Sequence, residues 1–190
     1  MEDRVVTISR ARTTVDYPAS FMLVAAMNPC PCGYYNHPDK DCVCSPGNVK
    51  NYLNKISGPL MDRIDLHIEV TPVAFDDLST KSSGESSDKI RPRVILARNI
   101  QKDRFEKAGN IYCNSQMSSK DIANYCMLNS NGQTLLKLAM EKLNLSARAY
   151  DRIIKVSRTI ADLDASHDIK NDHLAEAIQY RSLDRDNWGS

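Results

Sequence analysis

Residues 145–163, LSARAYDRIIKVSRTIADL, decide the fold of the second half of the chain. Ser146 is a good N-cap, and apolar residues at helical spacing follow it to Leu163, which predicts one long helix. Arg148 lies in the first turn, where the helix macrodipole disfavours a cation. An arginine held there indicates contact with an anion, either a ligand or a neighbouring carboxylate. Arg152 follows one turn later on the same face.

Further helices are predicted on both sides of this stretch. They cover 92–107, 118–126, 134–143 and, capped by Asn171, a last helix to about Tyr180. The 134–143 helix is amphipathic, with Leu135, Leu138, Ala139 and Leu143 at helical spacing. On the 92–107 helix the basic residues alternate with acidic ones, which indicates a solvated face; they are Lys102, Arg104 and Lys107.

The first half of the chain is predicted to mix strands with a helix. Alternating residues 4–9 and the β-branched run 13–17 indicate a hairpin with Arg10-Ala11-Arg12 at its tip. Apolar residues 21–27 fit a strand buried on both faces of a parallel sheet, and 64–70 fit another strand. Ser45-Pro46 opens a helix to Ile56 that Gly58-Pro59 ends.

The predicted fold is therefore α/β followed by all-α. We expect an α/β part over 1–71, a linker over 72–89 and a helical domain over 90–186. The linker assignment rests on residues 76–89, DDLSTKSSGESSDK, which are polar and serine-rich with no apolar periodicity.

Composition excludes several classes of protein. The 190 residues are 42% hydrophobic and 26% charged with a formal net charge of +1, which is typical of a soluble globular protein. No global basic field favours nucleic acid, so any such contact must be local. No apolar run approaches the ~20 residues that span a bilayer, and the N-terminus has no signal-peptide core. A cytoplasmic location is expected.

A cysteine cluster indicates a metal site. Two Cys-x-Cys pairs separated by nine residues supply four thiols, those of Cys30, Cys32, Cys42 and Cys44. Four thiolates can close a tetrahedral zinc shell, whose role would be structural because no catalytic position stays open. Two disulfides or four free thiols are the alternatives, and His37 lies between the pairs as a substitute ligand or a solvated loop residue. Cys113 and Cys126 are expected to be ordinary thiols.

Two further positions suit phosphate chemistry. Asn28 ends the apolar run 21–27, and ligands sit at the carboxyl ends of parallel strands, although an Asn before Pro is also a common turn. Arg63 lies in GPLMDRIDL, residues 58–66, between a predicted helix and a predicted strand. Its guanidinium suits a phosphate in a neighbouring subunit, and a surface pair with Asp62 or Asp65 is the alternative.

These elements together resemble one family. Met27-Asn28-Pro29, then GPLMDRID, then LSARAYDRIIKVSRTIADL is similar to the C-terminal half of magnesium-chelatase-like AAA+ ATPases of the YifB/ComM type. The resemblance implies that Asn28 is the sensor 1 residue, Arg63 an arginine finger acting in trans and Arg148 the sensor 2 arginine of a helical lid. It also implies that the hairpin is the pre-sensor 1 insertion shared with the MCM helicases.

The chain departs from the family pattern in one respect. It contains no G-x-x-x-x-G-K-[ST] loop and no strand ending in Asp-Glu, so it lacks the phosphate cradle and the magnesium ligands. We expect these motifs in an upstream segment. By itself the chain should be inactive, and ATP and magnesium should bind only to the full-length protein, in a hexameric ring of identical subunits.

The last expectation concerns the substrate on which the ATPase acts. Arg10 and Arg12 at the hairpin tip are candidates to touch DNA phosphates in the pore of the ring, against the alternative of a solvated turn. Tyr34 and Tyr35 are candidates to stack on a base, to contact a neighbouring subunit or to pack on the cysteine loop. The resemblance favours a DNA translocase or branch-migration helicase. A metal-chelatase motor and a non-catalytic zinc-stabilised interaction module are the alternatives.

Overall fold

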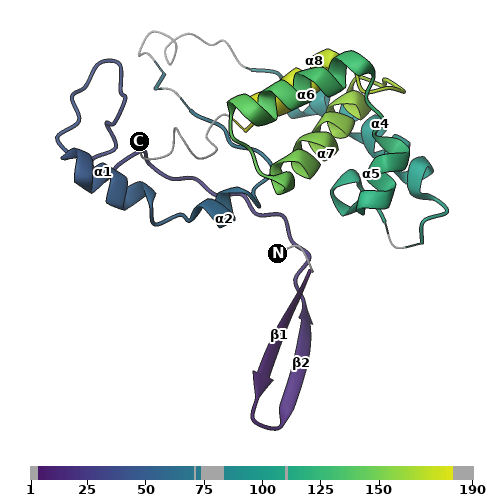
Figure 1. The fold of residues 1–190 in the computed structure, drawn as a ribbon, viewed down its shortest axis with the longest axis horizontal. Helices are drawn as coiled ribbons and strands as arrows, with labels where there is room; N and C mark the ends of the chain where they lie inside the picture. The colour runs from purple at the N-terminus through teal and green to yellow at the C-terminus, as the bar shows by residue number, and fades with distance from the viewer. Residues whose placement is uncertain (1–3, 71, 74–83, 110, 182–190) are drawn as a thin grey trace. The chain divides into compact units, whose positions relative to one another are not determined.

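The computed structural model describes residues 4–70, 72–73, 84–109 and 111–181, and the chain divides after Arg63 into two units (Figure 1). The first unit holds a hairpin, the cysteine loop and two short helices. The second unit is helical. The predicted order, α/β followed by all-α, is therefore found in its coarse form.

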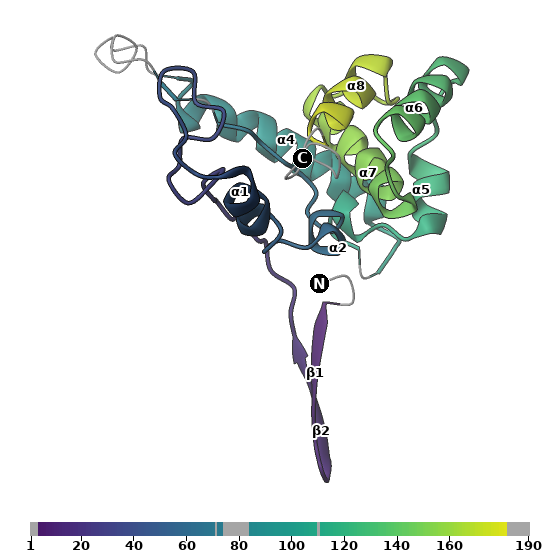
Figure 2. The ribbon, with the colours of Figure 1, turned by 60° about the vertical axis from the view of Figure 1, so that its left-hand side comes forward.

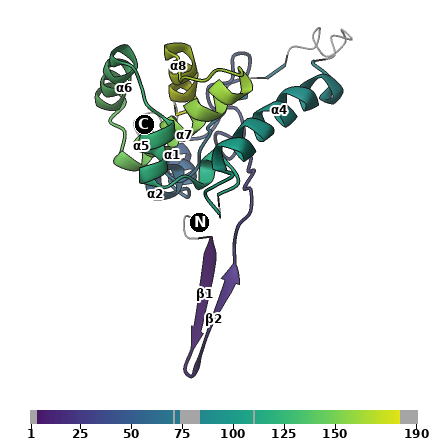
Figure 3. The same cartoon turned by 90° about the vertical axis from the view of Figure 1, so that its right-hand side faces the viewer.

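Two antiparallel strands form the predicted hairpin, β1 Val5–Arg10 and β2 Thr13–Pro18 (Figure 3). Ile8 lies opposite Val15, and the turn consists of Ala11 and Arg12. β-Branched residues favour this pairing because their side chains pack across strands. All twelve strand residues are exposed.

The prediction of two further strands, at 21–27 and 64–70, is wrong. Residues 21–27 and 64–70 are not in strands, and the side chains of Phe21 and Val24 are 65% and 81% exposed. A parallel strand is stable only between neighbours that take its backbone hydrogen bonds. Within the described ranges the hairpin is the only sheet, so no such neighbour is available.

The short helices of the first unit are α1 Pro46–Leu53 and α2 Gly58–Met61. Ser45 caps α1 as predicted, because its side chain accepts a hydrogen bond from the Asn48 backbone N–H. The predicted end was wrong: α1 stops at Leu53, and Gly58-Pro59 opens α2 instead of ending α1. Proline suits the first turn of a helix, where its missing N–H has no intrahelical partner.

In the second unit α7 contacts α4, α5, α8 and a short 3₁₀ turn, η1, while α6 packs against α8 (Figure 2). Their bounds are α4 Ser87–Phe105, η1 Asn114–Gln116, α5 Ser119–Tyr125, α6 Ser130–Lys142, α7 Ala147–Leu163 and α8 Asn171–Gln179. Ser146 caps α7 as predicted, with its side chain accepting from the Ala149 N–H. The core includes the fully buried Ile153, Ile154 and Leu174.

Several helix boundaries and faces differ from prediction. α4 begins at Ser87, inside the segment predicted as linker, of which residues 74–83 lie outside the described residues. α6 begins at Ser130 and not at the predicted residue 134, because the Asn129 side chain accepts from the Gly132 N–H at 2.7 Å and caps the helix four residues earlier. Its buried leucine is Leu136, whereas Leu138 is 57% exposed.

At the end of the chain, Asn171 is the first residue of α8 and not its cap. The ring of His173 accepts from the Lys170 backbone N–H at 3.1 Å and takes the place of a polar cap. The predicted end of the helical domain, 182–186, lies outside the described residues. Of the helices that are described, none combines the length and apolarity that a membrane span requires.

Candidate metal centre and arginine sites

The four predicted metal ligands lie together. The Sγ atoms of Cys30 and Cys32 are 3.3 Å apart, and the Cys42 Sγ lies 3.7 and 3.6 Å from them. With the Cys44 Sγ, all four lie within 4.8 Å of one another. Tetrahedral zinc with Zn–S bonds of about 2.3 Å has S···S edges of about 3.8 Å, whereas a disulfide needs about 2.05 Å. The geometry fits a thiolate shell.

No disulfide joins any of the six cysteines, which contradicts the disulfide alternative. Local sequence brings the two pairs together. Gly33 adopts a φ of +82°, and its N–H donates to the Cys30 carbonyl at 3.0 Å, which turns the chain directly after the first pair. A residue with a side chain would be strained at this position.

Hydrogen bonds distinguish the thiols. The backbone N–H of Tyr34 and then the Cys30 and Cys44 side chains lower the pKa of Cys32 to about 6, against the effect of burial. The Cys44 backbone N–H stabilises a Cys42 thiolate, but burial and the adjacent Cys32 and Cys30 sulfurs outweigh it and raise the pKa of Cys42 to about 12. One negative sulfur thus opposes ionisation of its neighbours. A divalent cation would relieve that repulsion.

His37 does not join the sulfur cluster. Its Nδ1 accepts a hydrogen bond from the Asp39 N–H at 3.0 Å, and its ring stands edge-on to Tyr34 at 5.7 Å. The Lys40 ammonium lies 4.9 Å from the centre of the Tyr34 ring. The Tyr34 ring therefore contacts other residues of the cysteine loop, as one of its alternatives predicts.

Asn28 and Arg63 belong to the first unit. Asn28 is exposed at the end of the extended apolar run. Arg63 follows α2 and is half-buried, and its Nη1 donates to the Pro59 carbonyl at 3.0 Å. Asp65, offered above as a partner for Arg63, pairs instead with Arg152, at 2.6 Å.

Arg148 belongs to the second unit. It is the second residue of α7 and is exposed. No described carboxylate forms an ion pair with it. The helix dipole disfavours a cation at this end of the helix. Within the described residues, no carboxylate offsets that unfavourable interaction of the Arg148 charge.

Sequence reasoning missed a buried charge network, and the solvated face predicted for Arg104 was wrong for that residue. The Arg104 guanidinium forms two hydrogen bonds to the Asp162 carboxylate, one of them 2.7 Å long, and a third, 2.8 Å, to the Asn114 side chain. Arg104 is 12% exposed and Asp162 is fully buried. The alternation of basic and acidic residues along α4 did not indicate that the Arg104 side chain contacts a carboxylate of α7.

The same carboxylate orders the end of α7. Arg158 Nε donates to it at 3.0 Å, and its two other nitrogens donate to the carbonyls of His167 and Ser166. Asn114 Nδ2 donates to it at 2.7 Å. Arg158 and Asp162 are four residues apart, so their pairing was the one signal of this network in the sequence.

The hairpin is amphipathic. One face carries two polar cross-strand pairs, with Thr7 donating to Asp16 at 2.6 Å and Ser9 bonded to Thr14 at 2.9 Å. The other face carries exposed apolar side chains, those of Val6, Ile8, Val15 and Tyr17. Arg10 and Arg12 are exposed at the tip, and no ion pair holds either of them within the described residues.

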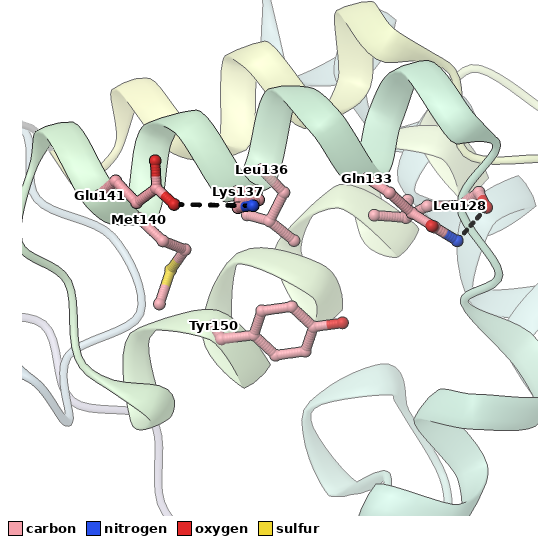
Figure 4. Close-up of a pocket in the computed structure, with 7 residues that line it drawn as sticks. All are labelled: Leu128, Gln133, Leu136, Lys137, Met140, Glu141 and Tyr150. Carbon is pink, nitrogen blue, oxygen red and sulfur yellow. Dashed lines mark hydrogen bonds and ion pairs between the residues drawn. The ribbon is translucent and has the colours of Figure 1, made fainter.

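A groove of about 500 Å³ lies between α6 and the start of α7 (Figure 4). Its lining is mostly apolar and consists of Leu128, Gln133, Leu136, Lys137, Met140, Glu141 and Tyr150. Lys137 and Glu141 form an exposed ion pair at 3.9 Å. None of the predicted site residues lines this groove.

Comparison with known proteins identifies the family. Residues 84–181 match the family model described as magnesium chelatase, subunit ChlI C-terminal, and residues 1–78 match the model described as magnesium chelatase, subunit ChlI. The chain belongs to the magnesium-chelatase ChlI family. Asn28, the cysteine cluster and Arg63 lie in the first matched region of this ChlI-family chain, and Arg148 lies in the second.

Individual relatives agree with this family. The competence protein ComM of Haemophilus influenzae is 45% identical over 186 residues, 97% of the ChlI-family chain and 35% of the relative. The uncharacterized protein YifB of Escherichia coli is 41% identical over 189 residues, with the same coverage of 97% and 35%. The chain thus spans about a third of the length of these curated relatives.

Proposed function

We propose that this chain is the sensor, arginine-finger and lid part of a ring-forming AAA+ ATPase. The observation that carries the proposal is Arg148, an exposed cation in the first turn of α7 without an ion pair in the described structure. A guanidinium in that position is stabilised by an anion such as a phosphate. In this role Arg148 binds the γ-phosphate of the ATP held by its own subunit.

The other two proposed site residues act at the ATP sites of different subunits, Asn28 at that of its own subunit. Asn28 is the sensor 1 residue, which orients the attacking water by a hydrogen bond. Arg63 acts on the ATP of the neighbouring subunit, where its charge stabilises the transition state of phosphoryl transfer. ATP and magnesium supply the phosphoryl group and the charge that polarises it. Because this chain has no Walker motif, its own residues sense and stabilise but do not hold the β-phosphate.

The cysteine cluster is proposed to hold one structural zinc ion. Four sulfurs at near-tetrahedral spacing support this, as does the thiolate character of Cys32. A complete shell leaves no open coordination position, so the metal stabilises the 30–44 loop and takes no part in hydrolysis.

The hairpin supports DNA as the substrate. Arg10 and Arg12 present two exposed charges, with no ion pair to a described residue, at the tip of a two-stranded ribbon, which suits contact with a phosphate backbone. In a hexameric ring, ATP-driven movement of these tips would translocate DNA or migrate a branch. A chelatase-type motor acting on a partner protein is the second candidate, favoured by the family itself.

The test is ATP turnover by the complete protein, with its Walker-containing segment, in the presence and absence of forked DNA. We expect DNA to stimulate turnover, and we expect the double variant Arg10→Ala/Arg12→Ala to lose that stimulation while keeping the basal rate. The matched control is Arg91→Ala/Arg98→Ala, which removes two exposed arginines from α4. Robust turnover indifferent to DNA would favour the chelatase-type motor. Absence of both turnover and ring assembly would favour a non-catalytic zinc module.

A further inference from the structure

The segment that directly follows Arg63 is anchored to the helical unit. The Arg181 guanidinium donates to the Ile64 carbonyl, and Arg152 Nη1 donates to the Asp65 carboxylate at 2.6 Å. The His67 backbone N–H donates to the Tyr180 carbonyl at 2.8 Å. Three successive contacts thus tie residues 64–67 to α7 and to the residues after α8.

Two of the anchoring residues are buried, and the ion pair is partly exposed. Arg181 is 1% exposed and His67 is 7% exposed. The Arg152 side chain is 19% exposed and that of Asp65 is 47% exposed. Because the arginine of this ion pair is mostly shielded from water, solvent and salt screen the pair less than they screen a fully exposed one, so it is able to hold the segment in register.

The anchor is close along the chain to both proposed phosphate ligands. Arg152 lies one turn after Arg148 on the same face of α7, a rise of about 6 Å. Asp65 is two residues after Arg63. The Asp65–Arg152 ion pair therefore joins the helix that carries the proposed sensor 2 arginine to the segment that directly follows the proposed arginine finger.

We infer that Asp65 and Arg152 are positioning residues that hold segment 64–67, which directly follows Arg63 in the chain, on helix α7, so that the finger offered to the next subunit follows the lid of its own subunit. The inference rests on the proposed function. When Arg148 engages ATP and α7 shifts, the segment 64–67 shifts with it and changes the placement of Arg63. One ATP site is thereby coupled to the next around the ring.

The first test is steady-state ATP turnover by the complete protein carrying Asp65→Asn, which removes the charge and keeps the shape. We expect kcat to fall about fivefold or more, the lower range of coupling between sites, while the KM for ATP changes less than twofold. Asp65→Glu should recover most of the rate. The matched control is Glu69→Gln, an exposed carboxylate on the same segment with no ion pair to a described residue, and it should behave as wild type.

Mixed rings separate positioning of the finger from general support of the lid. Arg63→Ala subunits mixed with Arg148→Ala subunits should regain turnover wherever an intact Arg63 meets a neighbour with an intact Arg148. Adding Asp65→Asn to the Arg148→Ala subunit, which donates the finger, should reduce the regained turnover about fivefold. Adding it to the Arg63→Ala subunit should change turnover less than twofold.

The outcomes distinguish the two proposals. Equal losses in both mixtures, or no loss in either, would overturn the positioning role of Asp65 while leaving Arg63 as the finger. Normal turnover by the Arg63→Ala protein alone would instead overturn the proposed function. Amide hydrogen exchange on the 190-residue chain gives a readout that needs no ATP: Asp65→Asn should speed exchange at residues 64–67, and unchanged exchange there would contradict the anchor.

Discussion

Removal of the Asp162 charge should destabilise the helical unit strongly. Asp162 is fully buried and accepts hydrogen bonds from Arg104, Arg158 and Asn114. In Asp162→Asn two guanidinium groups lose their counter-charge, and breaking a buried ion pair costs about 3–5 kcal/mol. Arg104 is 12% exposed and regains some water, and Arg158 keeps its two carbonyl acceptors. The lower end, about 3 kcal/mol, is therefore expected.

The assay is urea unfolding of the 190-residue chain, followed by circular dichroism at 222 nm, where the signal comes mainly from the second unit. A loss of about 3 kcal/mol in a domain of this size corresponds to about 12–24 °C in Tm. Asp103→Asn, an exposed carboxylate on α4, is the control and should stay within about 0.5 kcal/mol of wild type. If Asp162→Asn lost less than about 1 kcal/mol, the reasoning from buried charge would be refuted.

Three further predictions concern the site and its surroundings. The purified chain should contain one zinc ion, and Cys30→Ser/Cys32→Ser should release it and lower Tm, whereas Cys113→Ser should retain it; metal analysis that finds no zinc in the unmutated chain would reject the site. In the complete protein Arg63→Ala should abolish hydrolysis with nearly unchanged nucleotide affinity, because the finger acts on the transition state; normal turnover in this variant is the contrary result. The Ser118 hydroxyl and then its backbone N–H lower the pKa of Asp121 below its ordinary 3.8, so the stability that Asp121→Asn removes should be constant above that pH and disappear as pH falls through the folded-state pKa. Denaturant unfolding at several pH values measures this, and a difference that persists at low pH would count against the cap.

Local chemistry determined much of what was predictable. The hairpin, the capped helices α1 and α7 and the spacing of the cysteines depend on residues near one another in sequence. Ser146 caps α7 through a contact three residues away, and Gly33 turns the chain directly after Cys32. Sequence reasoning succeeds at this range because backbone geometry fixes which side chains within one turn can meet.

Long-range contacts were decided only by the tertiary structure. Arg104 pairs with a carboxylate 58 positions away, and Arg152 pairs with one 87 positions away. Charge alternation along a helix is the same whether a side chain meets water or a buried partner, because it does not say which face another helix covers. For the same reason, the apolar run 21–27 shows that a strand is favoured there but cannot supply the neighbouring strands that its backbone needs. Arg148 is the case where both levels are needed: sequence puts a cation at the unfavourable end of a helix, and the tertiary structure leaves it exposed with no described carboxylate paired to it.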